Sequence, residues 1–220
     1  MKKYIFGIFT IFSFIVLKLD AGQLIEICGI DGSGKTTFIE HLKENLEELG
    51  YSVITLKVIQ GDKRVYPFLN ELNLLKEDID QSYIHFLISN FRSDFFLLSF
   101  LKQKNNIETA LRQYDYVICD RYITAYKVYQ KCFNAYKEED ISLVDCMPVA
   151  NVTFYIDVPV EIAIERISKR KIVEVHENEC FLSKAQEIFK ETIIELNNYI
   201  SVRGDVPYEK IQQDVLSMFR

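Results

Sequence analysis

A glycine-rich segment near the start of the chain, residues 29–36, fits the spacing G-x-x-x-x-G-K-[ST] at every fixed position. Its glycines allow the backbone to wrap closely around an anion with the amide groups pointing inward. Lys35 can supply a flexible cation for the β- and γ-phosphates of a nucleotide, and the Thr36 hydroxyl can ligate Mg²⁺. An apolar run precedes the segment and an amphipathic stretch follows it, which favours a nucleotide site over a ligand-free turn.

A second group of polar residues follows the apolar run at 117–119, where Asp120, Arg121 and Tyr122 stand in succession. An acid at the end of a buried strand can hold Mg²⁺ through water or orient an acceptor phosphate. Arg121 can bind phosphate through two parallel hydrogen bonds. The alternative is an ordinary aspartate in a turn. A guanine-reading N-K-x-D segment does not occur in the sequence, which argues against a GTPase-type switch.

Both groups need a framework, and the chain alternates short apolar runs with longer amphipathic stretches, the order typical of a parallel sheet covered by helices. The predicted fold class is α/β: a P-loop NTPase three-layer fold, with helices on both faces of a parallel sheet. Strands are predicted at residues 24–28, 52–56, 116–119 and 152–156. Helices are predicted at 36–49, 82–104, 160–171, 183–199 and 208–219, and a loop at 61–67.

The composition of the 220-residue chain indicates a globular domain, because 49% of its residues are apolar and 26% are charged. A net charge of −6 argues against a nucleic-acid partner, since nucleic-acid binders present a basic face, and it leaves small anionic substrates open. The five cysteines form no C-x-x-C pair, which suits a reducing compartment. The histidines His41, His85 and His176 show no catalytic or metal-binding pairing.

The segment 1–22 differs from the rest of the chain. A basic start is followed by an apolar run at residues 4–17 and then by small residues, the pattern of a secretory signal. Three interpretations are open: a signal or anchor, a start assigned too far upstream, and an apolar segment packed on the domain. Because nucleotides and Mg²⁺ are abundant in the cytosol, a cytoplasmic location is predicted. The alternative is export or anchoring, with membrane contact possible only through residues 4–17.

With these motifs in place, the chain resembles the thymidylate kinase family of P-loop nucleoside monophosphate kinases. Residues 29–37 are similar to the family's G-x-D-G-S-G-K-T-T loop, and residues 120–130 are similar to its D-R-Y…Y-Q segment. Residues 151–166 resemble the strand and helix that lead to the family's lid, and residues 174–184 resemble the far side of that lid. The resemblance extends from about residue 24 to the C-terminus.

The resemblance implies an enzyme that transfers the γ-phosphoryl group of ATP to dTMP with Mg²⁺ and works as a homodimer. It implies a kinase domain at 23–220, with a lid around 166–180. The catalytic residues would be Lys35, Asp120, Arg121, Arg166 and Arg170, with Thr36 and Asp120 holding the metal. The residues that bind ATP would be Gly29, Asp31, Gly32, Ser33, Gly34, Lys35, Thr36 and Thr37. Those that bind the acceptor would be Phe86, Arg92, Arg121, Tyr122, Tyr129 and Gln130.

Two parts of this assignment have simpler alternatives. The basic residues at 166–171 also fit a solvated helix end whose charges complement the helix dipole. Phe86 lies in a stripe of aromatic residues at helical spacing, where packing in the core is the more common role.

The acceptor side of the chain departs from the family's pattern. Residues 56–58 stand in place of the family's R-E-P stretch, with Lys57 at best a partial substitute. Ala125 stands in place of a serine near the base, Val128 in place of an alanine, and residues 131–133 lack the glycines that often follow Y-Q. Two alternatives therefore stay open: a kinase for another nucleoside or nucleotide acceptor, and a nucleotide-binding protein without catalysis.

Overall fold

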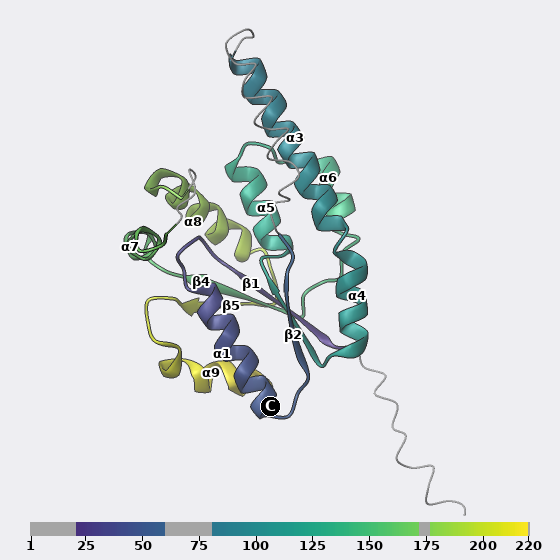
Figure 1. The fold of residues 1–220 in the computed structure, drawn as a ribbon, viewed down its shortest axis with the longest axis vertical. Helices are drawn as coiled ribbons and strands as arrows, with labels where there is room; N and C mark the ends of the chain where they lie inside the picture. The colour runs from purple at the N-terminus through teal and green to yellow at the C-terminus, as the bar shows by residue number, and fades with distance from the viewer. Residues whose placement is uncertain (1–20, 60–80, 172–176, 220) are drawn as a thin grey trace, which may run out of the picture.

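The computed structural model describes residues 21–59, 81–171 and 177–219, without the side chains of residues 81–89 and 92. Within these ranges, five parallel strands form one sheet in the order β2-β3-β1-β4-β5. β1 lies at the centre, so the glycine-rich segment that follows it starts from the middle of the sheet (Figure 1). The strands are β1 Gln23–Cys28, β2 Val53–Lys57, β3 Tyr116–Asp120, β4 Val152–Asp157 and β5 Tyr199–Arg203.

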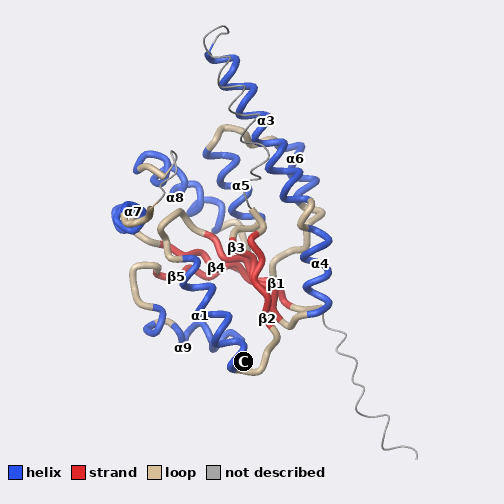
Figure 2. The backbone as a smooth tube through the Cα atoms, in the orientation of Figure 1, coloured by secondary structure: helices blue, strands red, loops and turns tan. Residues whose placement is uncertain are grey.

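Helices lie on both faces of the sheet (Figure 2), which confirms the predicted α/β three-layer fold. One face packs against α1 (Lys35–Glu48) and the C-terminal elements, which are η2 Tyr208–Lys210, α9 Gln212–Leu216 and η3 Ser217–Phe219. The other face packs against the remaining helices, α3 Gln81–Leu101, α4 Lys104–Gln113, α5 Ile123–Cys132, α6 Glu138–Val144, α7 Val160–Ser168 and α8 Glu179–Ile193.

The core explains why these segments adopt their structure. Because both faces of the sheet are covered, the central strands carry nearly continuous apolar runs rather than alternating patterns. On one face, Phe38 and Leu42 of α1 pack against Ile25 and Ile27 of β1. α1 ends where Gly50 adopts a φ of 90°, the left-handed conformation that commonly terminates helices.

The four predicted strands are confirmed within one residue at each end, and the predicted helix at 36–49 is confirmed as α1. The helix predicted at 160–171 is confirmed as α7 but ends three residues earlier, at Ser168. The loop predicted at 61–67 and the apolar run at 4–17 lie outside the described residues. Among the helices of the described ranges, none combines the length and apolar character that crossing a bilayer requires.

The single long helix predicted at 82–104 is wrong at its C-terminal end. α3 ends at Leu101, and a separate helix, α4, begins at Lys104. The apolar stripe of α3 stops there, and the polar residues that follow begin a new amphipathic pattern, in which Ile107 and Ala110 are buried.

The helix predicted at 183–199 is also wrong at its end, because the sequence prediction missed the fifth strand. α8 ends at Ile193, and β5 begins at Tyr199. Asn198 fixes this transition: its side-chain amide donates to the carbonyls of Ala150 and Asn151, and its backbone carbonyl accepts from Thr153. The helix predicted at 208–219 is divided among η2, α9 and η3.

Candidate phosphate-transfer site

The glycine-rich segment joins the end of β1 to the start of α1 at Lys35 and passes close to two other elements. Gly29, Gly32 and Gly34 all have positive φ angles. A Cβ atom on Gly32 would lie 2.4 Å from the backbone oxygen of Ala163 in α7. A Cβ atom on Gly29 would lie 2.6 Å from the backbone oxygen of Ile156 in β4. The loop therefore needs glycine both for its backbone conformation and for the space around it.

Lys35 is buried inside this loop. Its Nζ donates hydrogen bonds to the carbonyls of Gly29 at 3.0 Å and Ile30 at 2.7 Å, and to Ser33 Oγ at 3.4 Å. Burial, followed by repulsion from Arg121, lowers the pKa of Lys35 to about 7. A cation held by neutral oxygens in a buried place gains much from an incoming anion, so the geometry suits phosphate binding.

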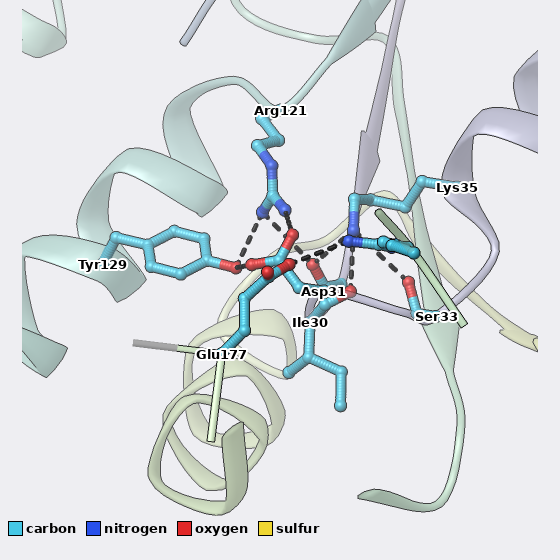
Figure 3. Close-up of polar contacts among 9 residues, drawn as sticks. Ile30, Asp31, Ser33, Lys35, Arg121, Tyr129 and Glu177 are labelled. Atoms are coloured by element: carbon cyan, nitrogen blue, oxygen red, sulfur yellow. Dashed lines mark hydrogen bonds and ion pairs between the residues drawn. The ribbon is translucent and has the colours of Figure 1, made fainter. Parts of the chain in front are cut away.

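Arg121, Asp31 and Tyr129 form a connected polar cluster next to Lys35, and Figure 3 shows their side chains pointing toward one another. Arg121 donates to the Tyr129 hydroxyl at 2.7 Å and forms an ion pair with Asp31. The Tyr129 hydroxyl in turn donates to Asp31 at 3.3 Å. These partners hold a guanidinium in place at the carboxyl end of β3, where an acceptor phosphate could replace the carboxylate.

All five predicted catalytic residues line one cavity of about 450 Å³. Arg166, from α7, donates to the carbonyls of Gly32 and Ser33 at 3.3 Å each. Arg170 lies past the end of α7 and pairs with Glu177 at 2.8 Å. The cavity is lined by Asp31, Gly32, Gly34, Lys35, Thr36, Thr37, Asp120, Arg121, Arg166 and Arg170.

The residues predicted to hold Mg²⁺ fit a hard cation. Asp120 Oδ1 is buried and has no hydrogen-bond partner among the described residues. Thr36 lines the same cavity. Carboxylate and hydroxyl oxygens are the ligands that Mg²⁺ takes in proteins, usually together with water and substrate phosphates.

The structure places the predicted acceptor residues in different environments. Tyr129 belongs to the polar cluster, and Gln130 is buried in α5. The Tyr122 ring is fully buried against Phe100, and its hydroxyl donates to a backbone carbonyl at residue 148, so the described contacts do not bring it to the cavity and its acceptor role stays a prediction. Arg92 and Phe86 belong to α3, but their side chains lie outside the described part of the structure.

A second cavity, of about 420 Å³, adjoins the first and was not predicted from the sequence. It shares Gly34, Thr37 and Arg166 with the first cavity, and its other side is formed by the segment that follows β5. Residues 203–208 line this cavity, and predicting their role requires recognising β5 first. The local signals for β5 are the alternation of residue types at 199–203, which is typical of a strand, and Gly204, which is typical of the turn that follows.

Comparison with known proteins agrees with this geometry. The family model described as Thymidylate kinase matches residues 27–215. The chain is 29% identical to the "Probable thymidylate kinase" of Archaeoglobus fulgidus, over 88% of this chain and 92% of the relative. It is 31% identical to "Probable thymidylate kinase 1" of Saccharolobus solfataricus, over 88% and 95%. It is also 30% identical to the "Thymidylate kinase" of Buchnera aphidicola subsp. Baizongia pistaciae, over 70% and 72%. With a phosphate loop and a cation-lined cavity of this form and a match over most of its length, the chain belongs to the thymidylate kinase family.

Proposed function

We propose that this protein is an ATP-dependent kinase that transfers the γ-phosphoryl group of ATP to dTMP and forms dTDP. The observation that carries the proposal is the cavity of about 450 Å³, because Lys35, Asp120 with Arg121, and Arg166 converge there from three places in the chain. A cavity lined by four cations beside a phosphate loop fits two phosphorylated substrates that must approach each other. Family membership supports the choice of dTMP as the acceptor.

The roles of the cations follow from their positions. Lys35 and the loop amides would hold the β- and γ-phosphates of ATP, and Arg166 lies beside them. Arg121 would bind the acceptor phosphate in exchange for its pair with Asp31. An oxygen of that phosphate then attacks the γ-phosphorus while the bond to the β-phosphate oxygen breaks, and ADP leaves with that electron pair. Positioning and charge stabilisation accelerate this step, so it needs no protein nucleophile.

Thr36 and Asp120 would hold Mg²⁺, which when bound neutralises charge on the ATP phosphates. Asp120 is fixed at the end of β3 by the parallel pairing of that strand with β1 and β2. The protein therefore supplies, on a residue that lines the cavity, a carboxylate with one oxygen that has no partner among the described residues.

The second cavity would take the base and sugar of ATP. It begins where the phosphate loop meets Arg166 and continues along the segment after β5, which includes Tyr208. The Tyr208 hydroxyl is buried and has no hydrogen-bond partner among the described residues, so it offers a polar group to a ligand that enters. The aromatic ring of Tyr208, which also lines this cavity, suits stacking or edge contact with a planar base.

The departures on the acceptor side affect packing more than contact with a substrate. Ala125 and Val128 are both fully buried on α5, where they pack with Cys28 and Ala163. This placement weakens the motive for a different acceptor and leaves dTMP as the first choice.

A phosphotransfer panel tests the proposal. Purified protein is incubated with ATP, Mg²⁺ and each nucleoside monophosphate or nucleoside in turn, and diphosphate or monophosphate products are measured. We expect dTMP to give the highest kcat/KM. Product with another acceptor alone would replace dTMP in the proposal. ATP binding by calorimetry without turnover on any acceptor would instead identify a nucleotide-binding protein that does not catalyse.

We also propose that the protein acts in the cytoplasm, where ATP and Mg²⁺ are abundant, and that it forms a homodimer. Sedimentation velocity at micromolar concentration measures the second property directly, and a monomer at all concentrations would contradict it. Mass determination of the N-terminus of protein from its native source shows whether residues 1–22 are retained.

A further inference from the structure

One carboxylate interrupts the apolar run of the central strand. Glu26 lies on β1 between Leu24 and Cys28, and only 2% of it is exposed. Its neighbours across the sheet are Cys119 of β3 and Thr153 of β4. Burying a carboxylate is costly unless strong hydrogen bonds satisfy it. The contacts of Glu26 therefore indicate its role.

Both carboxylate oxygens of Glu26 are bonded to the start of α5. Oε1 accepts from the backbone N–H groups of Tyr122, Thr124 and Ala125 at 3.2, 3.0 and 3.3 Å. Oε2 accepts from the Thr124 hydroxyl at 2.9 Å. Tyr122 is the N-cap residue, and its side chain makes no capping bond within the described structure. Glu26 therefore supplies, from a distant strand, the acceptors that the first turn of α5 requires.

Arg121 stands directly before this capped segment. Its φ of 64° lies in the left-handed region, which residues other than glycine rarely occupy. The backbone N–H of Arg121 donates to the carbonyl of Ile27 at 3.0 Å. The consecutive residues Glu26 and Ile27 of β1 thus hold the backbone on both sides of Arg121. Such conformations persist only where the surrounding contacts enforce them.

We propose that Glu26 is a positioning residue, which fixes the start of α5 and thereby holds Arg121 in the conformation that directs its guanidinium toward the acceptor phosphate. The inference rests on the proposed function, since the acceptor role of Arg121 belongs to it. Glu26 acts through the backbone of Arg121 and Tyr122 and not by touching either nucleotide.

The charge of Glu26 matters for this role and changes near neutral pH. Burial raises the pKa of its carboxyl to about 7, against the effect of its hydrogen bonds. The titratable groups that face it are Cys28 on β1, Cys119 on β3 and Tyr122 before α5. Burial raises the pKa of each of them, so they stay neutral at pH 7, and β4 and α5 present threonines, which do not titrate. Glu26 is therefore the member of this cluster that titrates in the physiological range.

The first experiment compares wild-type protein with Glu26→Gln, which keeps the side-chain shape and removes the charge, and with Glu48→Gln, the same change at the exposed end of α1. At pH 8, we expect Glu26→Gln to raise KM for dTMP about tenfold. This is the effect of losing the charge-assisted interaction between a misplaced Arg121 and the acceptor phosphate. KM for ATP should change by less than about twofold, because Arg121 serves the acceptor. Glu48→Gln should behave as the wild type.

Stability separates a positioning role from a merely structural one. The pKa of Glu26 in the folded protein lies above its unfolded value, so its contribution to stability is present at low pH and is lost as the pH rises through about 7. At pH 8, removing the charge should leave the unfolding midpoint unchanged or raise it. An unchanged KM for dTMP would overturn the inference, and so would a loss of acceptor affinity that parallels a lower midpoint.

A pH series adds a second readout. In the wild type, KM for dTMP should rise as the pH falls from about 8 to about 6, because Glu26 takes up a proton and weakens its hold on α5. The acceptor phosphate also titrates near pH 6. In Glu26→Gln, only the titration of the acceptor phosphate changes KM for dTMP with pH. The pH dependence of this KM should therefore be weaker than in the wild type. Profiles that run parallel in the two proteins would contradict the inference.

Hydrogen exchange in the ligand-free protein distinguishes failure of this inference from failure of the proposed function. At pH 8, the amides of Tyr122, Thr124 and Ala125 should exchange at least about tenfold faster in Glu26→Gln than in Glu48→Gln. Absence of wild-type turnover on dTMP would reject the proposed function and leave this measurement intact. Unchanged exchange of these amides rejects the role of Glu26 whatever the activity is.

Discussion

At the scale of single residues, Lys35 carries the clearest expectation. Its cation is bonded to the carbonyls of Gly29 and Ile30 inside the loop, so no other described side chain takes its place there. We expect Lys35→Ala to lower kcat on the order of a thousandfold or more, because the transferring phosphates lose their buried cation. Lys43→Ala, on the same helix, is the control. Near-normal turnover of folded Lys35→Ala, with folding checked by circular dichroism, would contradict the assigned role.

The lowered pKa of Lys35 also predicts that ATP binding is coupled to the uptake of a proton. Because burial and Arg121 lower its pKa to about 7, much of the free protein holds Lys35 neutral at pH 8. Bound phosphates favour the cation and raise this pKa, so binding should take up a proton. Titration calorimetry in buffers of different ionisation enthalpy measures the uptake. The uptake should shrink in Lys35→Met, and an identical uptake in both proteins would assign the proton to another group.

Arg121 predicts an effect on the acceptor alone. Its guanidinium is bonded to Asp31 and Tyr129, and it lines the first cavity but not the second. We expect Arg121→Ala to raise KM for dTMP at least about tenfold while KM for ATP changes little. Arg112→Ala, at the exposed end of α4, serves as the control in steady-state kinetics. Equal losses for both substrates would place Arg121 at the transferring group instead.

Residues that belong to a recognisable motif could be predicted, and residues that lie in no motif and whose partners are distant in the sequence could not. The phosphate loop is contiguous, so its chemistry was visible from its spacing alone. Tyr122 was assigned to the site through the resemblance of residues 120–122 to the family's D-R-Y segment, but its ring is buried in the core beside the left-handed turn at Arg121. Glu26 gave no sequence signal, because its partners stand 96 to 99 residues away.

At the scale of elements, the close approach of α7 to the loop predicts how a single methyl group would act. Gly32→Ala combines a positive φ with a contact at 2.4 Å to the backbone of Ala163. Gly50→Ala also places a side chain at a positive φ, of 90°, with nothing within 4 Å. Both variants should lose about 1 kcal/mol of stability through backbone strain. Only Gly32→Ala should lose ATP affinity, by more than about tenfold, because α7 and the loop must move apart.

Calorimetric ATP titration and thermal unfolding of the two glycine variants measure these effects side by side. Equal ATP affinity in Gly32→Ala and the wild type would show that the loop adjusts to the added methyl group. Equal losses of affinity in both variants would trace the effect to general destabilisation and not to the contact with α7.

Helices and strands could be predicted where a single pattern of apolar residues dominated the segment. β1, β3 and β4 carry apolar runs that belong to a covered parallel sheet, and each was found. β5 was missed because it is an edge strand with only partial burial, so just Val202 reads as a core residue. Its pairing depends on the bonds of Asn198 to the loop before β4, which no local pattern encodes.

At the scale of the whole molecule, the start of the sheet predicts which part of the chain can be removed. The amide of Gly22 donates to the carbonyl of Leu111 at 2.7 Å, and that of Gln23 donates to the carbonyl of Asp115 at 2.8 Å. These bonds hold the entry to β1 without residues 1–20. We expect a chain that lacks residues 1–20 to keep its unfolding midpoint and its kcat. Deletion through residue 25 removes half of β1 and should abolish folding, measured by circular dichroism.

The order of the strands was the feature least accessible to prediction. The sequence indicated a parallel sheet, but not that β1 lies between β3 and β4. The register pairs Ile25 with Ile118 on one side and with Val152 on the other. All three positions are apolar, so shifting the register by two residues would leave a similar hydrophobic pattern.

This strand order also sets when the protein becomes able to bind a nucleotide during its synthesis. The glycine-rich loop and α1 leave the ribosome early, whereas the backbone that confines Gly29 and Gly32 comes from β4 and α7 in the last third of the chain. Pairing between segments so distant in sequence is slow. A nascent chain therefore carries the complete phosphate motif before β4 and α7, which confine the loop in its binding conformation, have been synthesised. Cellular ATP can stabilise only chains that already include β4 and α7, which favours them over shorter chains.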